Sequence, residues 1–299
     1  MATAGRFQIP SRRLVLAGAA CAGLAACNEE RSEKEGPPQP DGPPRGSLEW
    51  AIQGAWRPDA DKARDRWLHP METLRFFDLQ PSMTVVEFWP GRGWWSDILA
   101  PYLADGGGVY YAAGFYAGEG ADPAQAALTR QLRARLTSDE KLYGEVQFTA
   151  FGANTGAVAP PGTADLVLFM RSIHRWMAAG IAEKAFADAF SALKPGGVLG
   201  VEQHRLPPDA DQDPAAASGY VQEPFVRQLA EEAGLVFVAA SEINANEADT
   251  KDHPFGVDTL PPVRLSAPRG QPADPAFDPA PFNAIGESDR MTLKFRKPE

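Results

Sequence analysis

The sequence predicts an α/β fold in which helices cover both faces of a parallel sheet. Strand-like apolar runs alternate with helix-like runs between residues 84 and 240, a pattern typical of parallel sheets. One run, Ala164–Met170, is almost continuously apolar, as expected of a strand that is covered on both faces. Another, Met83–Trp95, passes from an apolar strand through a glycine-containing loop into a helix. Because such sheets bind ligands beyond the carboxyl ends of their strands, we expect a ligand at this loop.

Residues 1–26 have the features of an export signal peptide. Arg12 and Arg13 precede a short apolar run, and small residues follow up to Cys27. The run Leu24-Ala-Ala-Cys27 resembles a bacterial lipobox, whose cysteine is lipidated, and Ser11-Arg-Arg-Leu-Val resembles a twin-arginine signal. The alternative is an ordinary secretory peptide with a chance cysteine. We expect an exported protein on the periplasmic face of the cell envelope, lipid-anchored through Cys27.

Composition narrows the possible partners. The formal net charge is −10 and the Lys and Arg residues are scattered, which argues against a nucleic-acid partner. The two cysteines are Cys21 and Cys27, so the mature domain is expected to lack disulfides, cysteine-ligated metals and cysteine nucleophiles. Residues 27–46 are charged and then rich in Pro and Gly, which predicts a disordered tether before a domain at 47–299. No later run approaches the roughly 20 apolar residues that cross a bilayer, so the lipid alone is expected to reach the membrane.

Three helices are predicted before the first strand. The first begins at Ser47, and apolar residues recur at every fourth position up to Trp56. The second covers Asp59–Leu68. Pro70 can open the third, and Pro81 ends it.

The first half of the predicted sheet consists of short elements. Thr84–Phe88 is a β-prone apolar strand, and Trp94–Leu103 is the helix after the glycine loop. A short strand at Gly108–Ala112 is followed by an amphipathic helix at Asp122–Leu136. Val146–Thr149 carries the weakest strand pattern.

The second half follows the buried strand Ala164–Met170. Its helices show apolar residues at helical spacing, and its strands are short apolar or alternating runs. These elements are the helix Trp176–Leu193 with the closing turn Lys194-Pro-Gly-Gly197, the strand Val198–Glu202, the helix Glu223–Ala233, and the strands Leu235–Ala240 and Met291–Phe295. Between the last two strands, residues 244–286 are rich in Pro, Asp and Asn and are too long for an ordinary connection. We expect an ordered, irregular insertion near the ligand-binding edge.

The order of these signals resembles a known family. It is similar to the order found in the class I S-adenosylmethionine-dependent methyltransferases. The signals are strand–Glu87–Gly91-x-Gly93–helix, then Asp165-Leu-Val-Leu-Phe, then Leu193-Lys-Pro-Gly-Gly-Val-Leu. The residues of the loop, together with His174-Arg-Trp and the tail 286–295, look like those of a bacterial group of uncharacterised predicted methyltransferases. Many members of that group carry export signals. The resemblance covers roughly residues 47–299. It implies a Rossmann-like, mostly parallel seven-stranded sheet and methyl transfer from S-adenosylmethionine to a small-molecule acceptor.

The resemblance also implies roles for individual residues. Glu87 is placed to attract the amino end of S-adenosylmethionine, and Gly91 and Gly93 permit close backbone approach. The loop after the fourth strand, including Met170 and Arg171, is expected to line the methionine side. Trp89 stands where the family has its first loop glycine.

The end of the second strand lacks the acid that usually holds the ribose, and Tyr110 or Tyr111 is the available substitute. His174 is the candidate general base, because its ordinary pKa lies near neutrality. The alternative is a histidine that orders its own turn. His204 also follows a strand, where a structural role is favoured.

Other interpretations remain open from the sequence. Trp94 and Trp95 are expected either to contact the cofactor or to pack beside a core. No His pair has the spacing of metal ligands, so no metal is expected. The alternative function is a non-catalytic, methyltransferase-like ligand-binding lipoprotein, whereas a nicotinamide oxidoreductase is disfavoured because the Lys-Pro-Gly-Gly turn is not part of its fingerprint. Neither the acceptor nor the oligomeric state follows from the sequence.

Overall fold

The computed structural model describes residues 42–299. The expected signal peptide, Cys27 and most of the expected tether lie outside this range. Within it, seven strands form one sheet in the order β3-β2-β1-β4-β5-β7-β6. The strand bounds are β1 Thr84–Phe88, β2 Val109–Phe115, β3 Gln147–Phe151, β4 Ala164–Met170, β5 Leu193–His204, β6 Val236–Ser241 and β7 Arg290–Arg296. β7 runs antiparallel to both its neighbours and the other pairings are parallel, which confirms the predicted fold class.

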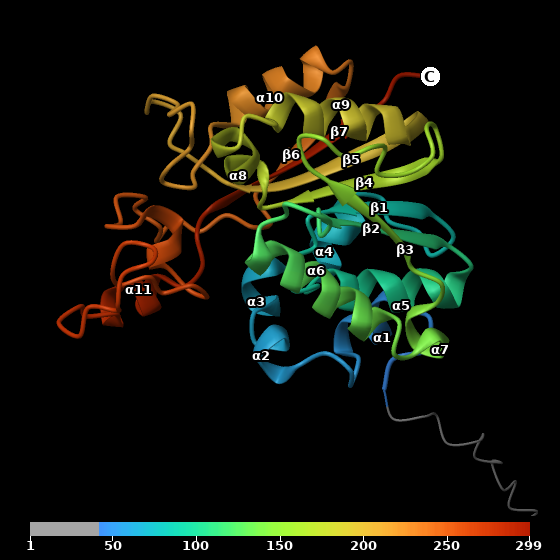
Figure 1. Cartoon of the computed structure of the whole chain (residues 1–299), viewed down its shortest axis with the longest axis horizontal. Helices are drawn as coiled ribbons and strands as arrows, with labels where there is room; N and C mark the ends of the chain where they lie inside the picture. Colours follow the sequence, from blue (N-terminus) through green and yellow to red (C-terminus); the bar gives the residue numbers. More distant parts are fainter. Residues whose placement is uncertain (1–41) are drawn as a thin grey trace, which may run out of the picture. The chain divides into compact units, whose positions relative to one another are not determined.

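Helices cover both faces of this sheet (Figure 1). One face carries α1 (Leu48–Gln53), α4 (Pro70–Phe76), α5 (Ser96–Gly106), α6 (Pro123–Leu136) and α7 (Glu140–Tyr143). The other carries α8 (Ile173–Ala178), α9 (Ala182–Ala192) and α10 (Glu223–Glu232). The short helices α2 (Asp59–Lys62) and α3 (Asp65–Leu68) divide the single helix expected at 59–68.

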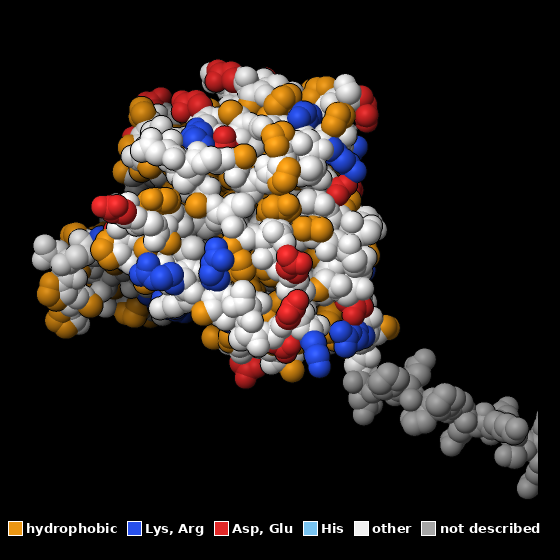
Figure 2. Space-filling model, turned by 45° about the vertical axis from the view of Figure 1, so that its right-hand side comes forward, with side chains coloured by type: hydrophobic (Ala, Val, Ile, Leu, Met, Phe, Trp, Pro, Cys, Tyr) orange, Lys and Arg blue, Asp and Glu red, His pale blue; other side chains and the backbone are white. Residues whose placement is uncertain are grey.

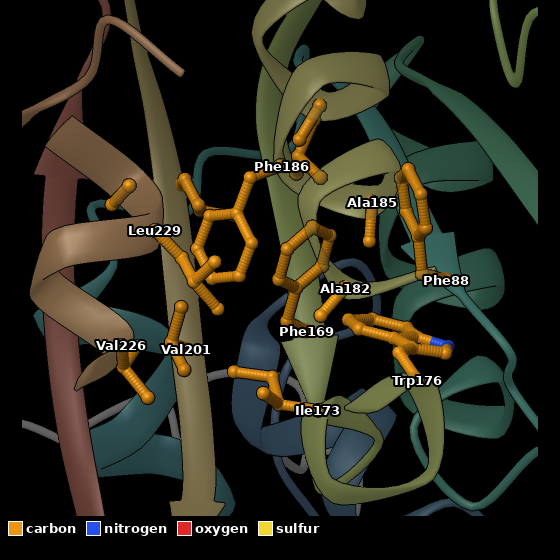
Figure 3. Close-up of a cluster of buried hydrophobic side chains, with 14 of the residues drawn as sticks. Phe88, Phe169, Ile173, Trp176, Ala182, Ala185, Phe186, Val201, Val226 and Leu229 are labelled. Carbon is orange, nitrogen blue, oxygen red and sulfur yellow. The ribbon is translucent and has the colours of Figure 1, made fainter. Parts of the chain in front are cut away.

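The face under α8, α9 and α10 is held by packed aromatic rings (Figure 3). Phe169 of β4 lies at its centre, with ring centroids 4.7 Å from Trp176 and 5.2 Å from Phe186. Phe88 of β1 is 4.8 Å from Phe169. Such edge-on contacts each contribute about 0.5–1.5 kcal/mol beyond the burial of area. This cluster packs the paired strands β1 and β4 against α8 and α9, next to the edge at which both strands end.

Several predicted elements have different bounds in the structure; the strand predicted at Val198–Glu202, for example, is β5, Leu193–His204. The helix expected at Trp176–Leu193 is two helices, because Gly180 at φ +65° interrupts it. The second strand runs on to Phe115, three residues past the predicted end. The Lys194–Gly197 turn follows the end of α9 at Ala192, as predicted, and it bulges from the start of β5, since Ala164 pairs with Leu193 and Leu166 with Val198.

Residues 244–286 contain only two helical turns, η1 (Gly256–Thr259) and α11 (Ala280–Ile285). A buried network ties this insertion to β7. Asp249 accepts hydrogen bonds from the Tyr220 hydroxyl at 2.9 Å and from the Asp289 amide at 2.8 Å, and it contacts His253 at 2.8 Å. The insertion is therefore held in place although it has little regular structure.

The surface drawn in Figure 2 mixes acidic, basic and apolar side chains. Within residues 42–299, no helix has the length and apolar character needed to cross a membrane.

Candidate functional site

A cavity of about 260 Å³ lies where β1, β4 and β5 end. This is the point at which the strand order reverses, since β1 is followed by β2 on one side while β4 lies on the other. Ligands bind at such switch points in parallel sheets. The cavity is lined by Glu87 and Trp89 at the end of β1, by Met170, Arg171 and His174 at and after the end of β4, and by His204 of β5. The insertion contributes Val257, Asp258 and Pro261–Val263 to the lining.

Glu87 lies at the carboxyl end of β1 and is 1% exposed. Its Oε2 accepts hydrogen bonds from the Tyr110 hydroxyl at 2.5 Å and from the Ser96 hydroxyl at 3.1 Å. Burial raises the pKa of Glu87 from 4.5 to about 7, against the lowering effect of these two hydroxyls. A carboxyl group with such a pKa becomes charged readily when a cationic group of a ligand approaches.

The raised pKa of Glu87 makes the stability of the protein depend on pH. A carboxyl whose pKa is higher when folded contributes stability that is complete below pH 4.5 and is lost as the pH rises through 7. We expect Glu87→Gln to become more stable relative to the wild type by about 2 to 3 kcal/mol between pH 5 and pH 8.5. Urea unfolding at both pH values measures this difference.

Other groups also titrate in this range. Burial raises the pKa of Asp97 to about 6. Burial lowers the pKa of His174 and of His204, so the contribution of these two side chains to the stability of the protein is lost as the pH falls. These groups are present in both proteins, so the comparison with Glu87→Gln isolates Glu87. A stability difference that stays constant with pH would show that Glu87 has an ordinary pKa.

Trp89 adopts a left-handed backbone conformation, with φ +47°. Its ring packs over the carboxyl ends of β2 and β3, with its centroid 4.6 Å from Phe115 and 6.0 Å from Phe151, and its Nε1 donates to the Phe151 carbonyl at 2.9 Å. The side of the site above β2 and β3 is therefore filled by the protein itself. Left-handed φ values in non-glycine residues are costly and gather at functional sites.

The two loop glycines have different roles. Gly91 has φ +60° and lines the cavity, and a Cβ there would meet nothing closer than the Trp89 carbonyl at 3.9 Å. Gly93 is away from the cavity: a Cβ would approach Arg135 to 2.4 Å and Leu132 to 2.5 Å. The structure therefore explains Gly93 by close packing against α6 and Gly91 by the open space of the site.

Arg171 follows β4 and has φ +56°. Within residues 42–299 its guanidinium donates no hydrogen bond, and its Nη1 lies 3.7 Å from Oε2 of Glu287. Burial lowers the pKa of Arg171 to about 10. The Arg171 side chain is 19% exposed and its buried Nε has no acceptor among the described residues, so the guanidinium has N–H donors available to an anionic ligand.

The surrounding ion pairs do not neutralise Arg171. Glu287 accepts two hydrogen bonds from Arg64, at 2.5 and 3.1 Å, and one from Arg290 at 3.0 Å. Arg290 also lies 3.1 Å from Glu202. This buried group holds three arginines against two glutamates, an excess of one positive charge that a ligand carboxylate, or an ionised Glu87, can balance.

His174 is oriented by Gln203. The Gln203 side-chain oxygen accepts the Ile173 amide at 3.1 Å, so its NH₂ group donates to the Gly219 carbonyl at 3.0 Å and to Nδ1 of His174 at 3.1 Å. Burial lowers the pKa of His174 to about 4. The neutral ring then carries its proton on Nε2, so His174 is a hydrogen-bond donor, which differs from the general base expected from the sequence.

The structure brings together most of the residues expected at the site. Glu87, Trp89, Gly91, Met170, Arg171 and His174 line one cavity, as do Trp94, Trp95 and His204. Tyr111 does not join them: β2 continues to Phe115, so Tyr111 lies opposite Val86 in the middle of the sheet and cannot reach its edge. Tyr110 contacts Glu87 instead.

Arg64, Gln203 and Glu287 also belong to the site and were not expected there. Arg64 and Glu287 are 223 residues apart, so no local pattern joins them. The tail 286–295 was a sequence signal, but for the family rather than for the site. In the described part of the chain, no three His, Cys, Asp or Glu residues gather as metal ligands.

Several solved structures resemble this chain at low sequence identity. A SAM-dependent methyltransferase from Aquifex aeolicus is 18% identical, with a TM-score of 0.48 over 63% of this chain and 94% of its own. An S-adenosylmethionine-dependent methyltransferase from Mesorhizobium loti is 12% identical, with a TM-score of 0.43 over 76% and 96%. The [4+2]-cyclase SpnF is 17% identical, with a TM-score of 0.47 over 82% and 83%.

No family model matches the sequence, and no curated protein matches it. The fold class follows from the chain's own strand order: a Rossmann-like α/β fold whose seven-stranded sheet is parallel except for β7 and carries helices on both faces.

Proposed function

We propose that this protein transfers a methyl group from S-adenosylmethionine to a small-molecule acceptor. The observation that carries the proposal is the pair of ionisable groups at the switch point, Glu87 near the end of β1 and Arg171 after β4, in one cavity. The amino-acid end of S-adenosylmethionine has a cationic amino group and a carboxylate, which these two side chains match in charge.

The residues of the chain divide the work of binding. Glu87 attracts the amino group, Arg171 donates to the carboxylate, and Gly91 leaves room for close approach. The cofactor supplies a methyl group on a sulfonium, which is transferred by direct displacement. Alignment is then the main task of the protein, and it contributes roughly 7–11 kcal/mol in favourable cases. His174 offers its Nε2 proton to orient the acceptor and does not remove a proton from it.

The residues fit the amino-acid end of S-adenosylmethionine but not its adenosine end. In this fold the adenosine extends from the switch point, and Trp89 fills the space over β2 and β3. β2 ends in Phe115, and the nearest acid after it is Glu119, which is exposed. Binding of the whole cofactor therefore requires the Trp89 ring to leave its place.

Calorimetric titration of S-adenosylmethionine and S-adenosylhomocysteine into the purified protein tests the proposal. We expect binding of both, weakened at least about tenfold by Glu87→Ala, because a charge-assisted contact is lost. No detectable heat at millimolar ligand would refute the enzyme proposal. Binding that Glu87→Ala leaves unchanged would place the cofactor elsewhere.

Trp89 favours a second candidate, a ligand-binding domain that does not turn over. In that case the cavity takes a small zwitterion between Glu87 and Arg171, and the space above β2 and β3 stays filled. Free methionine separates the two functions. Methionine bound as tightly as S-adenosylhomocysteine indicates the binding domain, whereas a large gain from the adenosine end indicates the enzyme.

The N-terminal sequence leads us to propose that the protein is exported and held at the envelope by a lipid on Cys27. We expect Cys27→Ser to move the full chain from the membrane fraction to the soluble fraction, because the lipid is the proposed anchor and no helix within residues 42–299 can cross a membrane. Cell fractionation followed by immunoblotting measures this. Cys21→Ser, inside the expected signal peptide, is the matched control and is expected to stay with the membrane. A Cys27→Ser protein that also stays there contradicts lipidation.

A further inference from the structure

A second cavity, of about 700 Å³, opens beside the first. It lies between the N-terminal helices α2 and α3 and the insertion, whose residues Pro261–Val263 and Asn283 line it. The two cavities share Arg64, Arg92, Pro261–Val263 and Glu287. The two cavities are therefore neighbours with a common set of lining residues.

The charges of the second cavity are not balanced. Arg66, Arg92 and Arg264 line it, and within residues 42–299 none of the three has a carboxylate oxygen within 4.0 Å. The acids that line it are Asp61 and Glu287, and Glu287 is already bound by Arg64 and Arg290. Within the described chain, the cavity is thus lined by three arginines without a carboxylate partner and by one acid, Asp61, that is not already bound to an arginine. The chain as a whole carries a net charge of −10, so this local excess of positive charge has the opposite sign to the protein.

The same cavity has an apolar wall. Trp67, Pro261, Pro262 and Val263 line it, and Val263 is 47% exposed. Arg66 lies over the Trp67 ring, 5.2 Å from its centroid. An apolar wall beside unpaired arginines matches a ligand with an apolar body and an anionic oxygen group.

We propose that the second cavity binds the methyl acceptor and that the acceptor is an amphipathic anion, a carboxylate or a phosphate ester with an apolar body. This inference rests on the proposed methyl transfer, because the bound anion is an acceptor only if the protein transfers a methyl group. The apolar body lies against Trp67 and Val263, and the anionic group pairs with Arg92 or Arg264. The end of the molecule near Arg64 reaches the first cavity.

Four ligands of eight carbons each test the charge requirement: octanoate, octyl phosphate, octan-1-ol and octylamine, titrated by calorimetry. We expect octanoate or octyl phosphate to bind at least roughly tenfold more tightly than octan-1-ol, and octylamine to bind most weakly. The tighter of the two anions identifies the anionic group. Equal binding of octanoate, octyl phosphate and octan-1-ol, or no binding of any of them, would overturn the inference.

Variants locate the binding. Arg92→Ala and Arg264→Ala are each expected to weaken the binding of the preferred anion by roughly three- to tenfold. Arg130→Ala removes an exposed arginine of α6 and is the matched control, expected to have no effect. Equal losses in all three variants would mean non-specific attraction and would refute the site.

The outcome is separable from that of the proposed function. If the protein binds the anions but not S-adenosylhomocysteine, the anion site is supported and the proposed methyl transfer is refuted. Binding of S-adenosylhomocysteine without preference for the anions removes only the acceptor class.

Discussion

Replacing Trp89 with glycine is expected to tighten the binding of S-adenosylhomocysteine by roughly 10- to 100-fold. In the wild type, a ligand that extends over β2 and β3 must first displace a ring that contacts Phe115, Phe151 and Trp176 and donates a hydrogen bond. Removing the ring removes that cost. Glycine also suits φ +47° better than tryptophan does.

The same variant is expected to lose stability, by about 2–4 kcal/mol, because the aromatic cluster loses a large member. Phe186→Leu is the control, since Phe186 packs in the same cluster but does not line the cavity. It is expected to lower the stability without changing the affinity. Calorimetry and thermal unfolding measure both quantities. Unchanged or weaker binding of S-adenosylhomocysteine in a folded Trp89→Gly protein would show that the Trp89 ring does not obstruct the ligand.

Removing the side chain of Arg171 is expected to separate binding from stability. Arg171→Ala should weaken the binding of S-adenosylhomocysteine roughly 30-fold or more, because the ligand carboxylate loses a largely desolvated charged partner. The melting temperature should stay the same or rise, because the guanidinium donates no hydrogen bond within the described chain and burial disfavours its charge.

Two controls distinguish recognition of the carboxylate from general damage at Arg171. Arg171→Lys keeps the charge but not the planar fork, and an intermediate affinity is expected. 5′-Methylthioadenosine lacks the amino-acid end, so its affinity should not change in Arg171→Ala. Equal losses for both ligands, or a large fall in melting temperature, would mean that Arg171 acts on the fold and not on the carboxylate.

The sequence predicted most accurately those elements whose local pattern is strong. β1 and β4 begin and end at the predicted residues, because each is an apolar run with clear limits. β2 was predicted three residues too short, since Ala113 and Gly114 have little strand propensity and belong to the strand through their pairing with β1 and β3.

That short prediction explains the error at Tyr111, which was expected at a strand end and lies within the strand. For the rest of the site, the accuracy of the prediction depended on how far apart the residues lie along the chain. Glu87 lies near the end of a recognisable strand, and Gly91, Arg171 and His174 follow such strands. The topology of a parallel sheet brings these strand ends together.

The partners of these residues come from elsewhere in the chain. Gln203 sets the proton of His174 from β5, and Arg64 reaches Glu287 from before the first strand. The pKa of Glu87 depends on a burial that no motif encodes. Residue types were therefore visible in the sequence, whereas protonation states and ion pairs required the packed structure.

The crystal structure of this protein with S-adenosylhomocysteine tests the central claim most directly. The ligand carboxylate is expected within hydrogen-bond distance of the Arg171 guanidinium, the amino group on the side of Glu87, and the Trp89 ring moved away from Phe115 and Phe151. A ligand bound with its amino-acid end away from both Glu87 and Arg171 would contradict the account.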